Sequence, residues 1–229
     1  RRDLTANGQL QSASTLDLQA QRALSLAGQA VAVGDARLRG TAVTVDQAAV
    51  VQSAAAITLE GTALDSRGAL DAGTDLTLHS DGDLALAGIA QSGRDLALQA
   101  GGALDTGAQV PAGRDLSLSA GRASQAAAGT LAAQGALALQ VDGTVDNAGT
   151  LHAGTDLHLQ AAGLQQRGSA YAGKTLVATV AGALDNQGSL VAHEGLQLDA
   201  RELRSSGQLG SETAGVDLTS AGELRLGGV

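Results

Sequence analysis

The chain has 229 residues, of which 44% are hydrophobic, and its 14 basic and 23 acidic residues give a net charge of −9. It contains no Phe, Trp, Met or Cys, one Tyr (Tyr171), one Pro (Pro111) and 32 Gly, which excludes cysteine chemistry and predicts a narrow core of small aliphatic side chains. The acidic surface repels phosphate groups and no apolar run approaches the ~18 residues of a membrane span, so we expect neither nucleic-acid binding nor membrane insertion.

Short β-strands with alternating apolar residues recur along the chain. Leu96-Ala97-Leu98 and Leu157-His158-Leu159 show this alternation, which together with the frequent Gly argues against the helix that Ala, Leu and Gln favour by propensity. In chain order, the first apolar residue of each strand lies at positions 16, 36, 57, 76, 96, 116, 137, 157, 176, 196 and 216. Because the steps are 19 to 21 residues, the sequence predicts one structural repeat that occurs eleven times.

Each repeat contains two further apolar anchors. The second follows the first by seven or eight residues, at Leu64, Leu84, Leu104, Val145, Leu164, Leu184, Leu203 and Leu224. The third follows six residues later, at Leu70, Ala90, Val110, Leu151, Ala170, Leu190 and Leu209. Gly lies between them, where a sharp corner needs positive φ or close backbone approach, at Gly68, Gly88, Gly107, Gly149, Gly168, Gly188 and Gly207. This pattern predicts an all-β fold, a right-handed parallel β-helix with three strands and three corners in each of about eleven coils.

The coil that begins at Leu116 departs from this spacing. It reaches Ala123 and then Leu131, and we expect the two extra residues in 124–128 to bulge outward. Coils are regular over 55–229 and less regular over 1–54, so we treat 1–229 as a single β-helix segment. The start lacks a signal-peptide apolar region and neither end carries a distinct cap sequence, so we expect a fragment of a longer fibre whose open strand edges favour end-to-end association.

Aspartates at two repeat positions are the first candidates for a chemical role. Asp75, Asp95, Asp115 and Asp156 share a position beside Gly, Thr and Arg, which favours a turn whose carboxylate accepts backbone N–H groups over a metal ladder. The same interpretation applies to the second group, which consists of Asp65, Asp105, Asp146 and Asp185. No Gly-Gly-x-Gly-x-Asp calcium repeat occurs, so we expect no metal site and no cofactor.

The histidines are the remaining candidates, and they fall at different repeat positions: His79, His152, His158 and His193. A zinc site or a general base needs converging partners, so we expect no catalytic, cofactor-binding or metal-ligating residue. Some parallel β-helices are polysaccharide-active enzymes, but these rely on carboxylates, basic residues and aromatic sugar platforms. With Tyr171 the lone aromatic residue, enzyme activity is a remote alternative, and we predict that the chain is no enzyme.

Four strings carry a family resemblance: Ala-Gly-Thr-Asp-Leu-Thr-Leu (72–78), Gly-Arg-Asp-Leu-Ala-Leu-Gln-Ala-Gly-Gly-Ala-Leu-Asp (93–105), Gly-Arg-Asp-Leu-Ser-Leu (113–118) and Ala-Gly-Ala-Leu-Asp-Asn-Gln-Gly-Ser-Leu (181–190). They resemble the repeats of filamentous haemagglutinin-type adhesins, which are two-partner secretion exoproteins. The resemblance covers 55–229 well and 1–54 more loosely. It implies a virulence-related fibre of Gram-negative bacteria, secreted through an outer-membrane transporter and either released or held at the cell surface.

The residues and the resemblance together predict a structural shaft or display segment of such a fibre, used in adhesion or in contact-dependent toxin delivery. The alternative is a module that binds a receptor or a glycan with one flat face. The partners implied are the adjacent coils of the same fibre, the transporter during secretion, and a host or bacterial cell-surface receptor or glycan.

Overall fold

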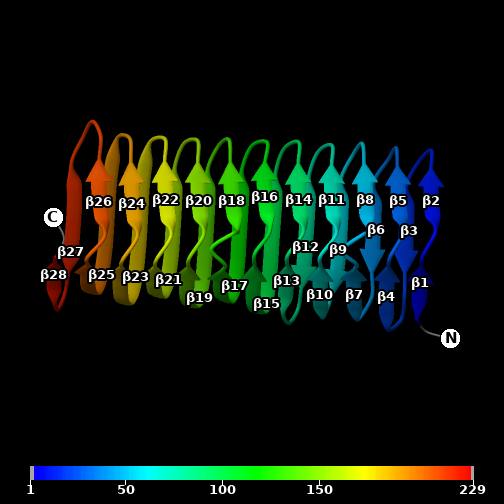
Figure 1. The fold of residues 1–229 in the computed structure, drawn as a ribbon, viewed down its shortest axis with the longest axis horizontal. Helices are drawn as coiled ribbons and strands as arrows, with labels where there is room; N and C mark the ends of the chain where they lie inside the picture. Colours follow the sequence, from blue (N-terminus) through cyan, green and yellow to red (C-terminus); the bar gives the residue numbers. More distant parts are fainter. Residues whose placement is uncertain (1–2, 228–229) are drawn as a thin grey trace.

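The computed structural model describes residues 3–227. In this range the regular secondary structure consists of β-strands, and every strand pair is parallel. Each coil places its strands at three positions, which we call the first, second and third faces after the three anchors. Figure 1 shows the coils following one another along the long axis in sequence order, with the termini at opposite ends of a rod. The predicted parallel β-solenoid is therefore confirmed.

The coils use two arrangements of strands, which differ at the corner between the first and second faces. Five strands lie on the first face only: β3 (Leu16–Gln19), β6 (Ala36–Arg39), β9 (Ile57–Gly61), β12 (Leu76–Ser80) and β27 (Val216–Ser220). Six strands lie on the second face only: β1 (Leu4–Ala6), β4 (Ala23–Leu26), β7 (Ala42–Val45), β10 (Ala63–Ser66), β13 (Leu84–Leu86) and β28 (Leu224–Leu226). Longer strands cross both faces: β15 (Leu96–Thr106), β17 (Leu116–Gln125), β19 (Leu137–Asn147), β21 (Leu157–Gln166), β23 (Thr175–Asn186) and β25 (Gly195–Ser205). The third face is formed by β2 (Gln9–Ser12), β5 (Gln29–Ala32), β8 (Val50–Ser53), β11 (Ala69–Ala72), β14 (Ile89–Ser92), β16 (Gln109–Ala112), β18 (Thr130–Ala133), β20 (Thr150–Ala153), β22 (Ser169–Ala172), β24 (Ser189–Ala192) and β26 (Gln208–Ser211).

The pairing register is that of the predicted anchors. On the first face Leu96 pairs with Leu76 on one side and with Leu116 on the other. The eleven predicted first anchors form one unbroken column from Leu16 to Val216. Because the register repeats from coil to coil, identical or similar side chains stack along the axis.

The core consists of these inward columns. Leu96 and Leu98 are buried, while Ala97 between them faces outward and is half-buried. Only Leu, Ile, Val and Ala make up the large hydrophobic cluster, as the absence of aromatic side chains predicted. Each fully buried Leu contributes roughly 1.5–3 kcal/mol, so the rod is held together by many equal, local contributions rather than by one centre.

The corner between the first and second faces differs from the prediction of three separate strands. In β15 and the later long strands the chain turns this corner without leaving the sheet, through register shifts such as the one between Ala100 and Ala103. A β-bulge of this kind bends a strand while the hydrogen-bond ladder continues on both sides. The chain therefore needs no loop at this corner.

The corner between the second and third faces carries the predicted glycines. A Cβ atom on Gly88 would lie 1.9 Å from the carbonyl oxygen of Gly68, and one on Gly188 would lie 2.0 Å from that of Gly168. Stacked coils approach each other too closely here for any side chain. Close backbone approach is the reason for glycine at six of the seven predicted positions. Gly107 is the exception, since a Cβ there would meet only the Ala126 Cβ, at 3.7 Å.

Extra residues form outward turns in two coils. Ala126–Ala128 are exposed, and the Gly129 N–H donates to the Ala126 carbonyl at 2.9 Å, which confirms an outward bulge. Ser124 and Gln125 remain in β17, so the bulge is narrower than expected. A second turn, closed by the Ala49 N–H and the Asp46 carbonyl at 2.8 Å, was not predicted.

Candidate functional site

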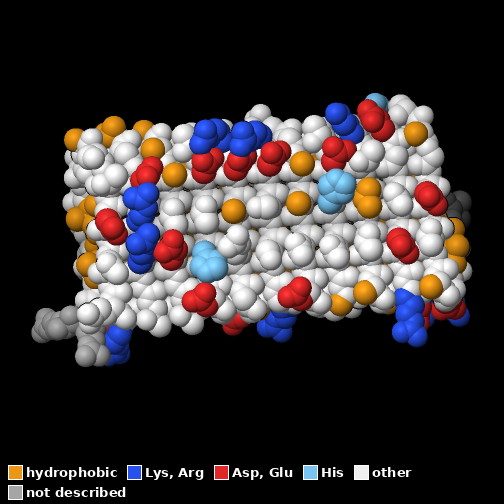
Figure 2. All heavy atoms as spheres, turned by 180° about the vertical axis from the view of Figure 1, so that it is seen from behind, with side chains coloured by type: hydrophobic (Ala, Val, Ile, Leu, Met, Phe, Trp, Pro, Cys, Tyr) orange, Lys and Arg blue, Asp and Glu red, His pale blue; other side chains and the backbone are white. Residues whose placement is uncertain are grey.

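The outward side chains, unlike the core, differ from face to face. Charged residues are frequent on the second face, where Asp65, Asp105, Asp146 and Asp185 occupy one outward column. Figure 2, which views the rod from behind Figure 1, shows acidic and basic side chains in small mixed groups with wide uncharged areas between them. Any binding function must use these outward columns, because the inward columns are inaccessible.

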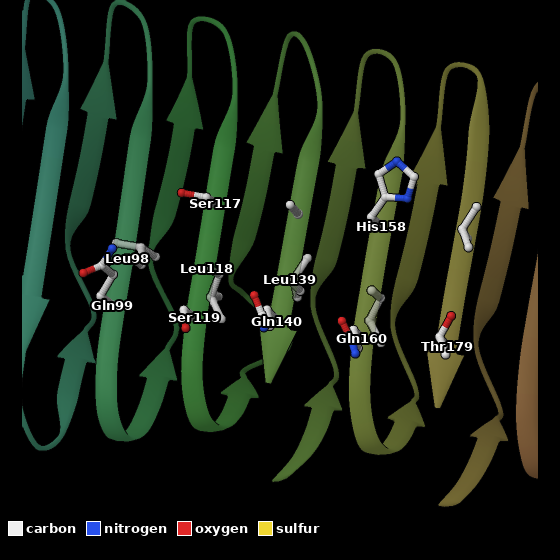
Figure 3. A pocket seen from close by; sticks show the side chains of 13 residues that line it. Leu98, Gln99, Ser117, Leu118, Ser119, Leu139, Gln140, His158, Gln160 and Thr179 are labelled. Carbon is white, nitrogen blue, oxygen red and sulfur yellow. The ribbon is translucent and has the colours of Figure 1, made fainter. Parts of the chain in front are cut away.

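A shallow groove of about 410 Å³ crosses the first face. Figure 3 shows its rim of hydroxyl and amide side chains, which project from neighbouring coils, with one imidazole among them. The lining residues are Leu98, Gln99, Ser117, Leu118, Ser119, Ala138, Leu139, Gln140, His158, Leu159, Gln160, Val177 and Thr179. Its floor is formed by nearly buried leucines, of which Leu159 is 4% exposed.

The chemistry of this groove is that of a hydrogen-bonding surface. Gln99, Gln140 and Gln160 offer amide donors and acceptors at the spacing of the coils, and His158 is the one titratable side chain that lines the groove. Acid–base hydrolysis of a glycosidic bond requires a pair of carboxyl groups, and no carboxyl group lines the groove. The arrangement can bind a polar ligand but lacks the groups for that reaction.

A second hollow, of about 560 Å³, lies on the third face. Pro111 and Ala132 are two of its lining residues, together with Asp71, Gln91 and the ring of His152. The His152 ring stacks on Tyr171 of the next coil with the centroids 5.5 Å apart and the planes at 8°. The sole aromatic residue of the chain thus lies on the same face as this hollow.

The first group of aspartates behaves as predicted, with the donor in the next coil. The Asp115 carboxylate accepts the backbone N–H of Ala136 at 2.8 Å, and Asp75 accepts that of Asp95 at 3.3 Å. Asp156 accepts both the N–H and the hydroxyl of Thr175, the hydroxyl at 2.6 Å. These carboxylates therefore join neighbouring coils.

Arginines reinforce the same contacts, which the sequence analysis did not foresee. Arg94 binds Asp75 through two nitrogens, at 2.6 and 3.2 Å, and Arg114 binds Asp95 in the same way one coil later. The hydrogen bonds from Arg94 and Arg114 hold the pKa values of Asp75 and Asp95 below the ordinary carboxyl range. A separation of 19 residues between Asp and Arg, one coil length, is the signal that reveals such a pair.

The prediction that the second group of aspartates lies in turns is wrong. Asp65 and Asp146 lie within strands rather than turns, and they bind arginine side chains: Asp65 pairs with Arg67 at 3.2 Å, and Asp146 pairs with Arg167. Asp185 accepts a hydrogen bond from Gln187, and Asp105 occupies the same outward column. Their place after a second anchor is an outward strand position, since side chains alternate, so a turn was the wrong interpretation.

The histidines are dispersed, as expected. His79 contacts Gln99 and Asp81 at 2.9 and 3.2 Å, and His193 contacts Glu212 at 2.7 Å. Over residues 3–227, no three His, Asp or Glu side chains converge in a way that could hold a metal ion. In the same range no helix is long and apolar enough to cross a membrane.

A buried polar column is the feature that sequence reasoning missed. Two residues after the second anchor, Asn147, Gln166 and Asn186 point into the core and are at most 1% exposed. Asn147 Nδ2 donates to Gln166 Oε1 at 3.0 Å, and Asn186 Nδ2 donates to the Ser205 hydroxyl at 3.0 Å. The signal was a polar residue at a position that Leu86 fills in an earlier coil.

Comparison with known families agrees with this architecture. Residues 1–61, 31–88, 85–126, 112–168 and 159–228 match the model of the haemagglutinin repeat. The chain belongs to the haemagglutinin-repeat family. Proteins with this repeat are generally secreted surface adhesins, and the repeat is a structural, adhesin-type unit. Searches among curated proteins and solved structures give no match.

Proposed function

We propose that this segment is a rigid shaft of a secreted fibre, which sets the distance between the cell surface and whatever the fibre presents. The observation that carries the proposal is the unbroken register of the three inward columns from β1 to β28. Every inner coil satisfies its backbone through its two neighbours, and each coil adds about 4.8 Å of length. Stiffness and length follow from the repeat alone.

The finer assignment follows from the family. We place the fibre at the outer surface of a Gram-negative bacterium, exported by a two-partner system and used in adhesion or in contact-dependent toxin delivery. In this role the chain carries no catalytic residue and needs no metal or cofactor.

Deletion of one coil tests the shaft. Residues 93–96 and 113–116 are both Gly-Arg-Asp-Leu, so removal of 96–115 leaves the junction sequence unchanged. We expect this variant to keep its β circular dichroism and to shorten by ~4.8 Å in small-angle X-ray scattering. The matched control, deletion of 96–105, shifts every later column off register and should unfold much of the rod. Equal damage from both deletions would refute the repeat as an independent spacer.

The groove of the first face supports a second candidate, the binding of a receptor or glycan. Its amide and hydroxyl rim suits a polar polymer laid across several coils. Screening the chain against glycans, with Gln140→Ala and His158→Ala as variants, tests this function. Binding that both variants abolish would support the second candidate, and unchanged binding would locate the site elsewhere.

A further inference from the structure

The third face is almost free of charge. Among the residues the structure describes, Asp71 is the only Asp, Glu, Lys or Arg at an outward position of β2, β5, β8, β11, β14, β16, β18, β20, β22, β24 and β26. The chain as a whole has a net charge of −9, so two rods repel each other least when these faces meet. The fold itself does not exclude charge, because the second face carries many charges. The first face also lacks Asp, Glu, Lys and Arg at outward positions, but only from β12 to β23, whereas the third face lacks them from β2 to β26 apart from Asp71.

Two outward columns run along this face. One is polar, and over the later coils it consists of Gln109, Thr130, Thr150, Ser169, Ser189 and Gln208. Over the same coils the other column is mainly apolar or aromatic and consists of Pro111, Ala132, His152, Tyr171, Val191 and Gly210. In the preceding coils this column is polar, with Gln52, Asp71 and Gln91. The near absence of charged side chains and the presence of Tyr171 are features that this surface shares with the core of a protein interface.

The second column contains both a ridge and a hollow. The stacked rings of His152 and Tyr171 form the ridge. The adjoining hollow, of about 560 Å³, begins at His152, lies over the small side chains Pro111 and Ala132, and extends past Gln91 to Asp71. The two features lie side by side in one column, so a surface with this profile can complement itself.

We propose that the third face is a self-association surface, on which two copies of this chain pack side by side and antiparallel. A two-fold axis at the level of Ala132 places His152 opposite Pro111 of the second copy and Tyr171 opposite Gln91 of the second copy. Each ridge then enters the other copy's hollow, and like columns face each other. A two-fold pair of this kind is closed, so it yields a dimer rather than an open polymer.

The area available is sufficient. In this arrangement β8 to β26 of each copy overlap, and each of these third-face strands has four residues. At ~4.8 Å between strands and ~3.3 Å per residue, the contact covers about 550 Å² on each copy, or about 1,100 Å² in total. Specific interfaces need roughly 1,000 Å² or more. The dimer is therefore expected to be reversible rather than permanent.

Tyr171 provides a direct probe, because the chain has no other Tyr, Trp or Phe. Sedimentation equilibrium over a range of concentrations should show a monomer–dimer equilibrium. Acrylamide should quench the fluorescence of Tyr171 about twofold less in the dimer, since the ridge is then covered. Ala132→Arg places two guanidinium groups together at the axis and should weaken dimerisation at least about tenfold.

The matched control is Ala138→Arg, which introduces the same side chain at an outward position of the first face and should leave dimerisation unchanged within about twofold. Circular dichroism checks that each variant is folded. If Ala132→Arg does not fold, Gln91→Arg, on the rim of the hollow, replaces it as the test variant. A monomer at all concentrations would overturn the proposal. So would open-ended polymers in which Tyr171 stays fully quenchable, because these would show that the rods associate through their ends.

Discussion

Gly188→Ala should damage the rod out of proportion to the single methyl group that it adds. The new Cβ would lie 2.0 Å from the Gly168 carbonyl oxygen and 2.7 Å from the Arg167 carbonyl carbon. Relief of the first contact needs a separation of about 1 Å between the coils. The same Gly168 oxygen accepts the Ser189 N–H at 2.9 Å, and opening the corner by this amount would break that bond.

The expected cost follows from these contacts. One or two buried backbone hydrogen bonds at roughly 1–3 kcal/mol each, together with local repacking, amount to about 2–5 kcal/mol. Gly195→Ala is the matched control, because a Cβ there meets no atom within 4 Å. That variant should be neutral or slightly stabilising, since alanine restricts the unfolded chain.

Urea unfolding, followed by far-UV circular dichroism and by the fluorescence of Tyr171, measures both variants. The Tyr171 signal matters because it reports on a coil next to Gly188, whereas circular dichroism averages over the rod. A midpoint for Gly188→Ala within error of that for Gly195→Ala would refute close coil approach as the reason for these glycines.

Three further predictions concern the core, the ion pairs and the buried amides. Leu96→Asp should cost several kcal/mol in urea unfolding because it buries an unpaired charge, while Ala97→Asp, on the outward side, should cost far less. Asp95→Asn should cost at most about 1 kcal/mol at pH 7, because the Arg114 pair is exposed to solvent. Since the pKa of Asp95 is lowered, this difference should be fully present above its ordinary value of 3.8 and disappear as pH falls below it. Gln166→Leu should cost about 1–3 kcal/mol because Asn147 Nδ2 loses its acceptor, and adding Asn147→Leu should restore part of that loss.

The inward half of this structure was predictable from the sequence. Leu76, Leu96 and Leu116 recur at one coil length because each fills the same place above its predecessor. The sequence period therefore identifies the core column directly. Ala123 and Leu131 also fall on their columns, although they belong to a longer coil. A solenoid makes this possible, since every contact is between neighbouring repeats.

Contacts one coil away were harder to predict, because they depend on register rather than on local sequence. Asp75 was assigned to a turn from its neighbours, yet its partners, Arg94 and the N–H of Asp95, lie 19 and 20 residues later. Asn147 and Gln166 stand in a column that Leu86 also occupies, so their burial becomes visible only when the coils are aligned. The continuous corner at Ala100–Ala103 depends on bulge geometry. Glycine recurs at each of these register shifts, at Gly101, Gly102, Gly121, Gly143, Gly163 and Gly182, and this signal went unused.

The outward columns carry the information that the fold does not use. A shaft needs Leu, Val and Ala inside and Gly at one corner, and any polar or charged residue would be compatible with the solvent-exposed outward positions. On the second face these positions are filled with charged residues such as Asp65 and Arg204, as solubility alone would favour. On the third face, strands that pair in the same parallel way lack charge at their outward positions from β2 to β26, apart from Asp71, and carry Tyr171, the sole Tyr, Phe or Trp of the chain. This difference between the two faces is what we expect if the third face packs against a second copy of the chain, as proposed.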